Sequence, residues 1–208
     1  VMVVSAAGTE GFKDALLRRL AFTGLGAVAF VAAARTDYRW WRRHNLGVLA
    51  VALVALTAVL VPGVGARING ARRWTRPILG LGLQPSEFAK VALCIWVAAY
   101  CERNITRMRS FAHGFVAPLS VVGVAALLVL AEPDFGTAVL LGTMSMAVLL
   151  VCGTRLLYVM LSGMAVLPVL HQLVLGAPYR LRRIVAFLDP WADPLGSGYQ
   201  LCQSLIAI

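Results

Sequence analysis

The chain has 208 residues, of which 60% are hydrophobic and 13% are charged, and its mean hydropathy is +0.82. Soluble globular domains carry about 25% charged residues, so this composition excludes an ordinary soluble protein and indicates an integral membrane protein. The formal net charge of +10 does not indicate nucleic-acid binding, because no basic groove with interleaved aromatic residues is present. Membrane lipids explain the basic loops better, and we expect no nucleic-acid partner.

Six apolar runs follow one another along the chain, and most approach the roughly 20 residues that a helix needs to cross the hydrocarbon core. The first and third reach that length only with residues 15–19 and with residues from Gln84 onward. The sequence therefore predicts an all-α, polytopic integral membrane protein with about six transmembrane helices. These runs cover residues 20–34, 46–62, 88–100, 115–131, 135–153 and 156–176.

The two ends of the sequence are apolar and carry no polar tail. Residues 1–5 are typical of the end of a helix whose beginning is absent, and residues 201–208 form another apolar run. We therefore expect residues 1–208 to form a single transmembrane domain that is incomplete at both ends.

The loops between the runs alternate in character. One set is short, whereas residues 63–83 and the segment that starts at residue 177 are long and contain most of the loop glycine and proline. Alternate loops of a multi-pass protein lie on the same side, so we expect the two long loops to share one face. Basic residues are divided almost evenly between the faces, so the positive-inside rule does not orient the chain. Arginines on the long-loop face suggest that they hold phosphate, and headgroup anchoring is the alternative.

Two helices that enter from the long-loop face begin alike, with Gln84-Pro85-Ser86-Glu87 and with Glu132-Pro133-Asp134. Proline at the first position and an acid in the first turn suit the unpaired amides and the positive end of a helix. Glu87 and Lys90 are spaced i, i+3 and should face each other near membrane depth, where ionisable groups are costly and often functional. A structural ion pair and a direct substrate role both stay open for them.

The segment from Asp189 to Gln200 places two acids in a polar loop of an otherwise hydrophobic chain. Arginines 180, 182 and 183 lie just upstream, directly after a segment long enough to span a bilayer. This pattern suggests chemistry on an anionic, membrane-bound substrate. Aspartate before proline is also a common turn signal. We expect Gly196 and Gly198 to give the loop flexibility.

Four motifs, read in order, resemble those of the SEDS family (shape, elongation, division and sporulation). Their order, and the spans of fitting length between them, make the match more specific than any single motif. The motifs are Asn69–Trp74, Gln84–Lys90, Glu132–Ala138 and the loop Asp189–Gln200. Pro190-Trp191 and Gly198–Leu201 favour the division member over the elongation member. The resemblance implies a ten-helix fold, of which this chain would run from the end of the first helix to the loop after the seventh. The long loops, 63–83 and 177–208, would then be extracytoplasmic.

The resemblance also implies an activity. SEDS proteins are peptidoglycan glycosyltransferases of the bacterial cytoplasmic membrane, and the division member acts at the septum and polymerises lipid II into glycan strands. An undecaprenyl diphosphate leaves without a proton but needs its negative charge stabilised. One carboxylate base and several cations are therefore expected, with Mg²⁺ or Mn²⁺ as a candidate cofactor. By resemblance the base is Asp193, which would deprotonate the acceptor sugar 4-hydroxyl for an inverting displacement, and Asp189 is the weaker candidate.

The remaining candidate site residues are mostly cationic. We expect Arg72, Arg73 and Lys90 to contact the diphosphate, with Arg180 and Arg183 as further candidates. Glu87 and Asp134 are expected to orient these cations. Trp191 is a candidate for stacking on a sugar face, although tryptophan is also common in interfacial belts.

Two other functions stay open from the sequence. One is a flippase that moves lipid II across the membrane, and the other is a scaffold for a class B penicillin-binding transpeptidase. The resemblance implies such a transpeptidase and other divisome proteins as partners. Asp193 separates the first alternative from catalysis, because a flippase needs no base in an extracytoplasmic loop.

Overall fold

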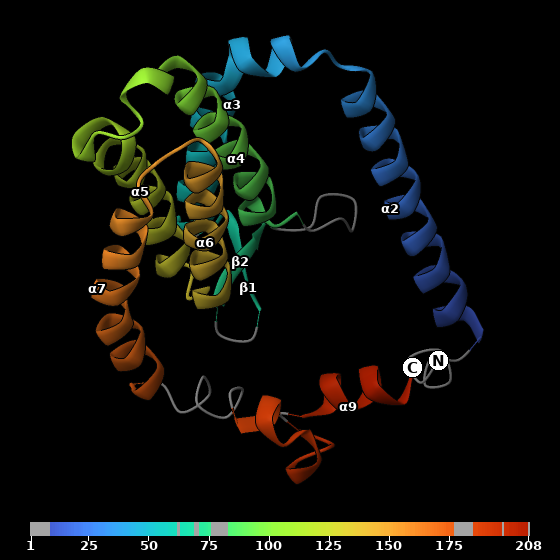
Figure 1. Ribbon diagram of the computed structural model, residues 1–208. Coiled ribbons are helices and arrows are strands. Elements are labelled where there is room, and N and C mark those ends of the chain that lie inside the picture. Colours follow the sequence, from blue (N-terminus) through green and yellow to red (C-terminus); the bar gives the residue numbers. More distant parts are fainter. Residues whose placement is uncertain are drawn as a thin grey trace. The chain divides into compact units, whose positions relative to one another are not determined.

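The computed structural model describes residues 9–61, 63–68, 71–75, 83–176, 185–196 and 198–207 (Figure 1). Helices dominate these ranges, together with one hairpin of two strands. The long helices are α2 (Thr9–Arg35), α3 (Tyr38–Leu60), α4 (Pro85–Arg103), α5 (Ala117–Ala131), α6 (Phe135–Val151) and α7 (Leu156–Leu175), and the short α9 is Tyr199–Ile206. The strands are β1 (Gly65–Ile68) and β2 (Ala71–Thr75).

Each of the six predicted spans is a helix, so the all-α prediction is confirmed. Tyr38–Leu60 and Ala112–Ala131 are long and apolar enough to cross a membrane, with mean hydropathies of 1.7 and 2.4. Leu20–Arg35, Phe135–Val151 and Leu156–Pro168 are shorter apolar helices. Large apolar side chains are exposed along the helices, as in Phe30 at 74% and Met164 at 67%. Such exposure suits helices whose outer faces contact lipid rather than water.

The hairpin lies in the first long loop, where the sequence predicts no regular structure. β1 and β2 pair antiparallel, from Gly65 opposite Thr75 to Ile68 opposite Ala71, with an irregularity after Ala66. Gly65 is required there because a Cβ would collide with the carbonyl oxygen of Val59. The pairing satisfies backbone donors and acceptors that a loop close to a membrane cannot leave unpaired.

The contacts divide the chain into two compact units. The first comprises residues 1–103 and 121–145, and the second comprises residues 104–120 and 146–208. In the first unit, α3 packs along α4 (Figure 1). The buried residues of α3 recur at helical spacing, at Leu49, Ala52, Leu56 and Val59, and small residues such as Ala52 let the two backbones approach closely.

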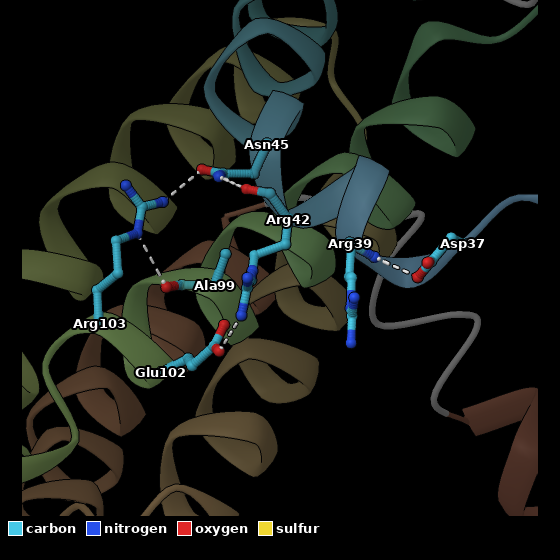
Figure 2. A network of polar contacts seen from close by, with 7 residues as sticks. All are labelled: Asp37, Arg39, Arg42, Asn45, Ala99, Glu102 and Arg103. Carbon is cyan, nitrogen blue, oxygen red and sulfur yellow. Dashed lines mark hydrogen bonds and ion pairs between the residues drawn. The ribbon is translucent and has the colours of Figure 1, made fainter.

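Polar contacts join one end of α3 to the end of α4 (Figure 2). Arg42 donates to Glu102 over 2.6 Å, and both side chains are about half exposed, at 49% and 53%. Asp37 caps α3 by accepting a hydrogen bond from the backbone N–H of Arg39 at 2.9 Å. Such a cap satisfies one of the amides that a helix start leaves without a partner.

A buried amide lies next to that ion pair. Asn45 is 3% exposed, and its Oδ1 accepts a hydrogen bond from the Arg103 guanidinium at 2.8 Å. The Asn45 amide group donates to the carbonyl oxygen of Arg42, and Arg103 also donates to the carbonyl oxygen of Ala99 at 3.1 Å. The sequence predicts no role for Asn45, which connects α3 to α4 through its Oδ1 and binds the backbone of its own helix through its amide nitrogen.

In the second unit, a π-helical turn at Ala112–Val116 lies against the start of α7. Thr154 donates a buried hydrogen bond to the carbonyl oxygen of Gly114 at 2.9 Å. The rings of Phe111 and Tyr158 meet edge to face, with centroids 5.2 Å apart. A Cβ at Gly114 would collide with the carbonyl oxygen of Met108, so a close backbone approach explains the glycine.

Candidate functional site

The start of α4 carries an ion pair that the spacing predicts. Lys90 Nζ lies 2.8 Å from Oε1 of Glu87 and 2.8 Å from its Oε2. The Lys90 side chain is 21% exposed and that of Glu87 is 60% exposed. The expected contact between Glu87 and Lys90 is therefore confirmed. An ammonium group has three donors, so Lys90 keeps donor capacity for a further anionic ligand.

Asp134 lies directly before α6 and is only 8% exposed. Its Oδ1 accepts the backbone N–H of Thr137 at 3.2 Å, and its Oδ2 accepts the Thr137 hydroxyl at 3.0 Å. Gln84, directly before α4, donates its side-chain amide to Oδ2 at 3.3 Å. Among the lysines and arginines whose side chains the structure describes, none forms an ion pair with Asp134, so its expected role in orienting cations stays a prediction.

Two further polar residues of the first unit are buried and were not assigned a role from the sequence. Glu132 is 0% exposed and Ser86 is 0% exposed. Both belong to the motif segments that open α4 and α6, so the starts of these helices combine several buried polar groups. The signal for Glu132 was present, because an acid that ends an apolar run is costly unless the fold uses it.

The loop with the two acids begins with a turn that uses Asp189. Its Oδ1 accepts the backbone N–H of Trp191 at 3.2 Å and caps the short turn Pro190–Ala192. This contact gives Asp189 a local structural role. Trp191 is 58% exposed, which leaves its ring accessible for stacking or for an interfacial position.

Asp193 is exposed and is held by the residues that follow it. Its Oδ1 accepts the backbone N–H of Gly196 at 3.0 Å, and its main-chain oxygen accepts the N–H of Gly198 at 3.0 Å. Cys202 in α9 donates its thiol to the carbonyl oxygen of Pro190 at 3.1 Å. The loop is therefore attached to the first turn of α9, and the expected flexibility from the two glycines stays a prediction.

Four predicted cations fall outside what the structure describes. Arg72 and Arg73 belong to β2, but only their backbone is described, and Arg180 and Arg183 lie in the range 177–184, outside the described residues. Their expected contacts with a diphosphate stay predictions. Lys90 belongs to the first unit and Asp193 to the second.

Metal-binding side chains do not gather in the described part of the chain. Its His, Cys, Asp and Glu residues form no group of three or more that could hold a metal ion. These residues therefore do not fit a metal cage built by the protein itself.

Comparison with known proteins gives a consistent result. A model of the FtsW/RodA/SpoVE family, described as "Cell cycle protein", matches residues 1–208. The "Probable peptidoglycan glycosyltransferase FtsW" of Trichlorobacter lovleyi is 39% identical over 213 residues, which cover 100% of this chain and 56% of that protein. The protein of the same name from Allochromatium vinosum is 42% identical over 192 residues, which cover 92% of this chain and 48% of that protein. The chain spans about half the length of these curated relatives.

A solved structure shares the fold. A chain in the structure described as "Structural coordination of polymerization and crosslinking by a peptidoglycan synthase complex" superimposes with a TM-score of 0.68 at 33% sequence identity. The match covers 93% of this chain and 56% of that chain. Both sequence and fold are therefore similar to one group of proteins over nearly the whole chain.

Proposed function

Because this chain belongs to the FtsW/RodA/SpoVE family of cell cycle proteins, we propose that it forms part of a peptidoglycan glycosyltransferase that polymerises lipid II during septal wall synthesis. The observation that carries this proposal is the extent of the match. A relative named as a probable peptidoglycan glycosyltransferase aligns with 100% of the chain, so the loop with Asp193 and the starts of α4 and α6 all lie inside the matched region.

Asp193 is the general base in this proposal. Its carboxylate accepts the proton of the acceptor 4-hydroxyl while that oxygen forms a bond with the anomeric carbon of the donor sugar. The bond from that carbon to the diphosphate oxygen breaks, and undecaprenyl diphosphate leaves with the electron pair. Attack opposite to the leaving group inverts the anomeric centre. A positioned base of this kind typically contributes about 10²- to 10⁴-fold to a rate.

Cations stabilise the leaving diphosphate. Lys90 is the cation whose position the structure describes, and Glu87 orients it over 2.8 Å. Arg72, Arg73, Arg180 and Arg183 complete the proposed set, since guanidinium groups bind phosphate oxygens in a bidentate manner. Charge stabilisation at a leaving group is commonly the largest single contribution to such a reaction.

We also propose that a divalent cation helps to stabilise the negative charge of the leaving diphosphate. Mg²⁺ is often held by one or two carboxylates together with substrate phosphates, and such a mode needs no cage of protein ligands. Chelation of divalent cations in the polymerisation assay, followed by readdition of Mg²⁺ or Mn²⁺, tests the requirement.

The same family membership supports a location and partners. We propose a multi-pass protein of the bacterial cytoplasmic membrane at the division septum, with its long loops outside the cytoplasm. A class B penicillin-binding transpeptidase and other divisome proteins are the proposed partners. The similar solved structure supports this, because its description joins polymerisation and crosslinking in one synthase complex.

Reconstitution separates this activity from its alternatives. The full-length protein is placed in vesicles with its transpeptidase partner and supplied with labelled lipid II, and both glycan polymer and lipid II transport across the bilayer are measured. The proposal predicts polymer whose formation depends on the full-length protein. Transport without polymer would contradict the proposal and favour a flippase. Neither activity, together with intact septal recruitment of the transpeptidase in cells, would contradict it and favour a scaffold.

A further inference from the structure

Asp193 and Gly196 approach each other more closely than any side chain at position 196 would allow. The Gly196 N–H donates to Asp193 Oδ1 at 3.0 Å. A Cβ at position 196 would lie 2.7 Å from Oδ1 and 2.8 Å from Cγ, and closer still to Oδ2. The obstacle is therefore the whole carboxylate group, so an alanine at position 196 and the observed Asp193 rotamer exclude each other.

Gly198 constrains the backbone of the same residue. Its N–H donates to the main-chain oxygen of Asp193 at 3.0 Å. A Cβ there would lie 3.0 Å from that oxygen and would collide with the carbonyl oxygen of Pro190. Gly198 is also buried, although the loop around it is largely exposed.

Backbone conformation does not explain these two glycines. The glycines with positive φ among the described residues are Gly63 and Gly153, whereas Gly198 has a φ of −86°. Residues with a side chain adopt such conformations without strain. The absence of a side chain at positions 196 and 198 therefore serves close contact with Asp193 and its neighbours.

We propose that Gly196 is a positioning residue for the Asp193 carboxylate, with Gly198 fixing the backbone on which that carboxylate stands. The inference rests on the proposed function, in which Asp193 is the base. A base acts only when it lies within hydrogen-bond reach of the proton that it removes, and a misplacement of about 1 Å can cost on the order of 10²-fold in rate. The Gly196 N–H fixes the carboxylate orientation, and the missing side chain leaves room for it.

The first experiment compares two glycine variants in the full-length protein with its partner. Gly196→Ala forces the Asp193 carboxylate to rotate, so kcat for lipid II polymerisation is expected to fall by about 10- to 100-fold, while KM stays within about twofold of wild type. Gly163→Ala in α7 is the matched control, because a Cβ at Gly163 meets nothing within 4 Å, and its kcat should equal that of wild type. Wild-type kcat in Gly196→Ala would overturn the inference, as would a rise in KM with kcat unchanged.

The second experiment is a double-mutant cycle that does not depend on catalysis. Removal of the carboxylate in Asp193→Ala makes space for a Cβ at position 196, so Gly196→Ala should lower the melting temperature less in the Asp193→Ala background than in wild type. This relief also applies if Gly196→Ala alone folds poorly, because the double variant should then regain folding. Equal effects in the two backgrounds would overturn the contact on which the inference depends.

The two experiments also separate the inference from the proposed function. If Asp193→Ala polymerises lipid II at the wild-type rate, the base assignment fails, whatever the melting data show. If Asp193→Ala is inactive and Gly196→Ala keeps full kcat, the function stands and the positioning role of Gly196 is overturned.

Discussion

The side-chain amide of Gln84 donates a hydrogen bond to the carboxylate of Asp134 over 3.3 Å. Gln84 directly precedes α4 and Asp134 directly precedes α6, so this bond joins the starts of two helices whose sequences are 50 positions apart. The start of α4 also carries Glu87 and Lys90. The bond between Gln84 and Asp134 therefore helps to position Lys90, the proposed diphosphate contact, without involving Lys90 itself.

Loss of the Asp134 carboxylate is expected to destabilise the protein. Asp134→Ala removes the acceptor for Gln84 and for two groups of Thr137 at a site that is only 8% exposed, which should cost about 1–3 kcal/mol. Gln84→Ala removes one of these bonds and should cost less. Gln84→Glu places a second carboxylate next to that of Asp134 and should cost more than Gln84→Ala. Thermal unfolding in detergent measures this order, and equal melting of Asp134→Ala and wild type would contradict it.

The buried amide of Asn45 should matter more than the ion pair beside it. Asn45→Ala leaves the Arg103 guanidinium without its 2.8 Å acceptor and is expected to cost about 1–3 kcal/mol. Glu102→Gln breaks a pair whose side chains are about half exposed and should cost less than about 1 kcal/mol. Melting temperatures of the two variants at low and high salt test this. A larger loss in Glu102→Gln would be inconsistent with the described contacts.

Gly114 should not tolerate even a methyl group. A Cβ at this position would lie 2.5 Å from the carbonyl carbon of Met108 and 2.9 Å from its Cα, so Gly114→Ala forces backbone atoms apart and should cost about 1–3 kcal/mol. A Cβ at Gly123 in α5 meets nothing within 4 Å, so Gly123→Ala should be neutral or stabilise by up to about 1 kcal/mol. Melting temperatures of the two alanine variants measure this. A lowered melting temperature in Gly114→Ala but not in Gly123→Ala indicates that close backbone approach, rather than helix propensity, determines the glycine at position 114.

Lys90 should contribute to the reaction as well as to the ion pair. Lys90→Met removes the cation proposed to contact the diphosphate, so kcat/KM for lipid II should fall by about 10-fold or more. Hydrogen bonds to charged groups contribute more free energy than those between neutral groups. Lys90→Arg should retain part of the activity. Glu87→Gln keeps the Lys90 ammonium and removes its carboxylate partner at 2.8 Å, so its loss of kcat/KM should be smaller than that of Lys90→Met. Wild-type kcat/KM in Lys90→Met, with a lowered melting temperature, would leave Lys90 a purely structural role.

Much of the fold could be predicted from the sequence because membrane helices are encoded locally. The length of an apolar run predicts a transmembrane span, and each of the six predicted runs corresponds to a helix of the structure. The pair of Glu87 and Lys90 was predictable for the same reason, since i, i+3 neighbours on a helix face each other. The hairpin of β1 and β2 was not, because its pairing satisfies backbone groups and leaves little pattern in the side chains.

Contacts between distant segments could not be predicted in this way. No local pattern indicates that Gln84 meets Asp134 or that Asn45 meets Arg103, because these pairs depend on how helices pack. The sequence did contain a signal for Gly196 and Gly198, which follow Asp193 within five positions. That spacing is also typical of a flexible turn, and the two meanings separate only when the position of the missing Cβ is known.

The rate of lipid II polymerisation by Asp193→Asn tests the central claim most directly. Asparagine keeps the size of the side chain and an oxygen that can accept the Gly196 N–H, but it cannot accept a proton from the acceptor hydroxyl. The full-length variant with its transpeptidase partner should fold like wild type, bind lipid II, and polymerise it at least about 100-fold more slowly. Polymerisation at the wild-type rate by Asp193→Asn would contradict the assignment of Asp193 as the base.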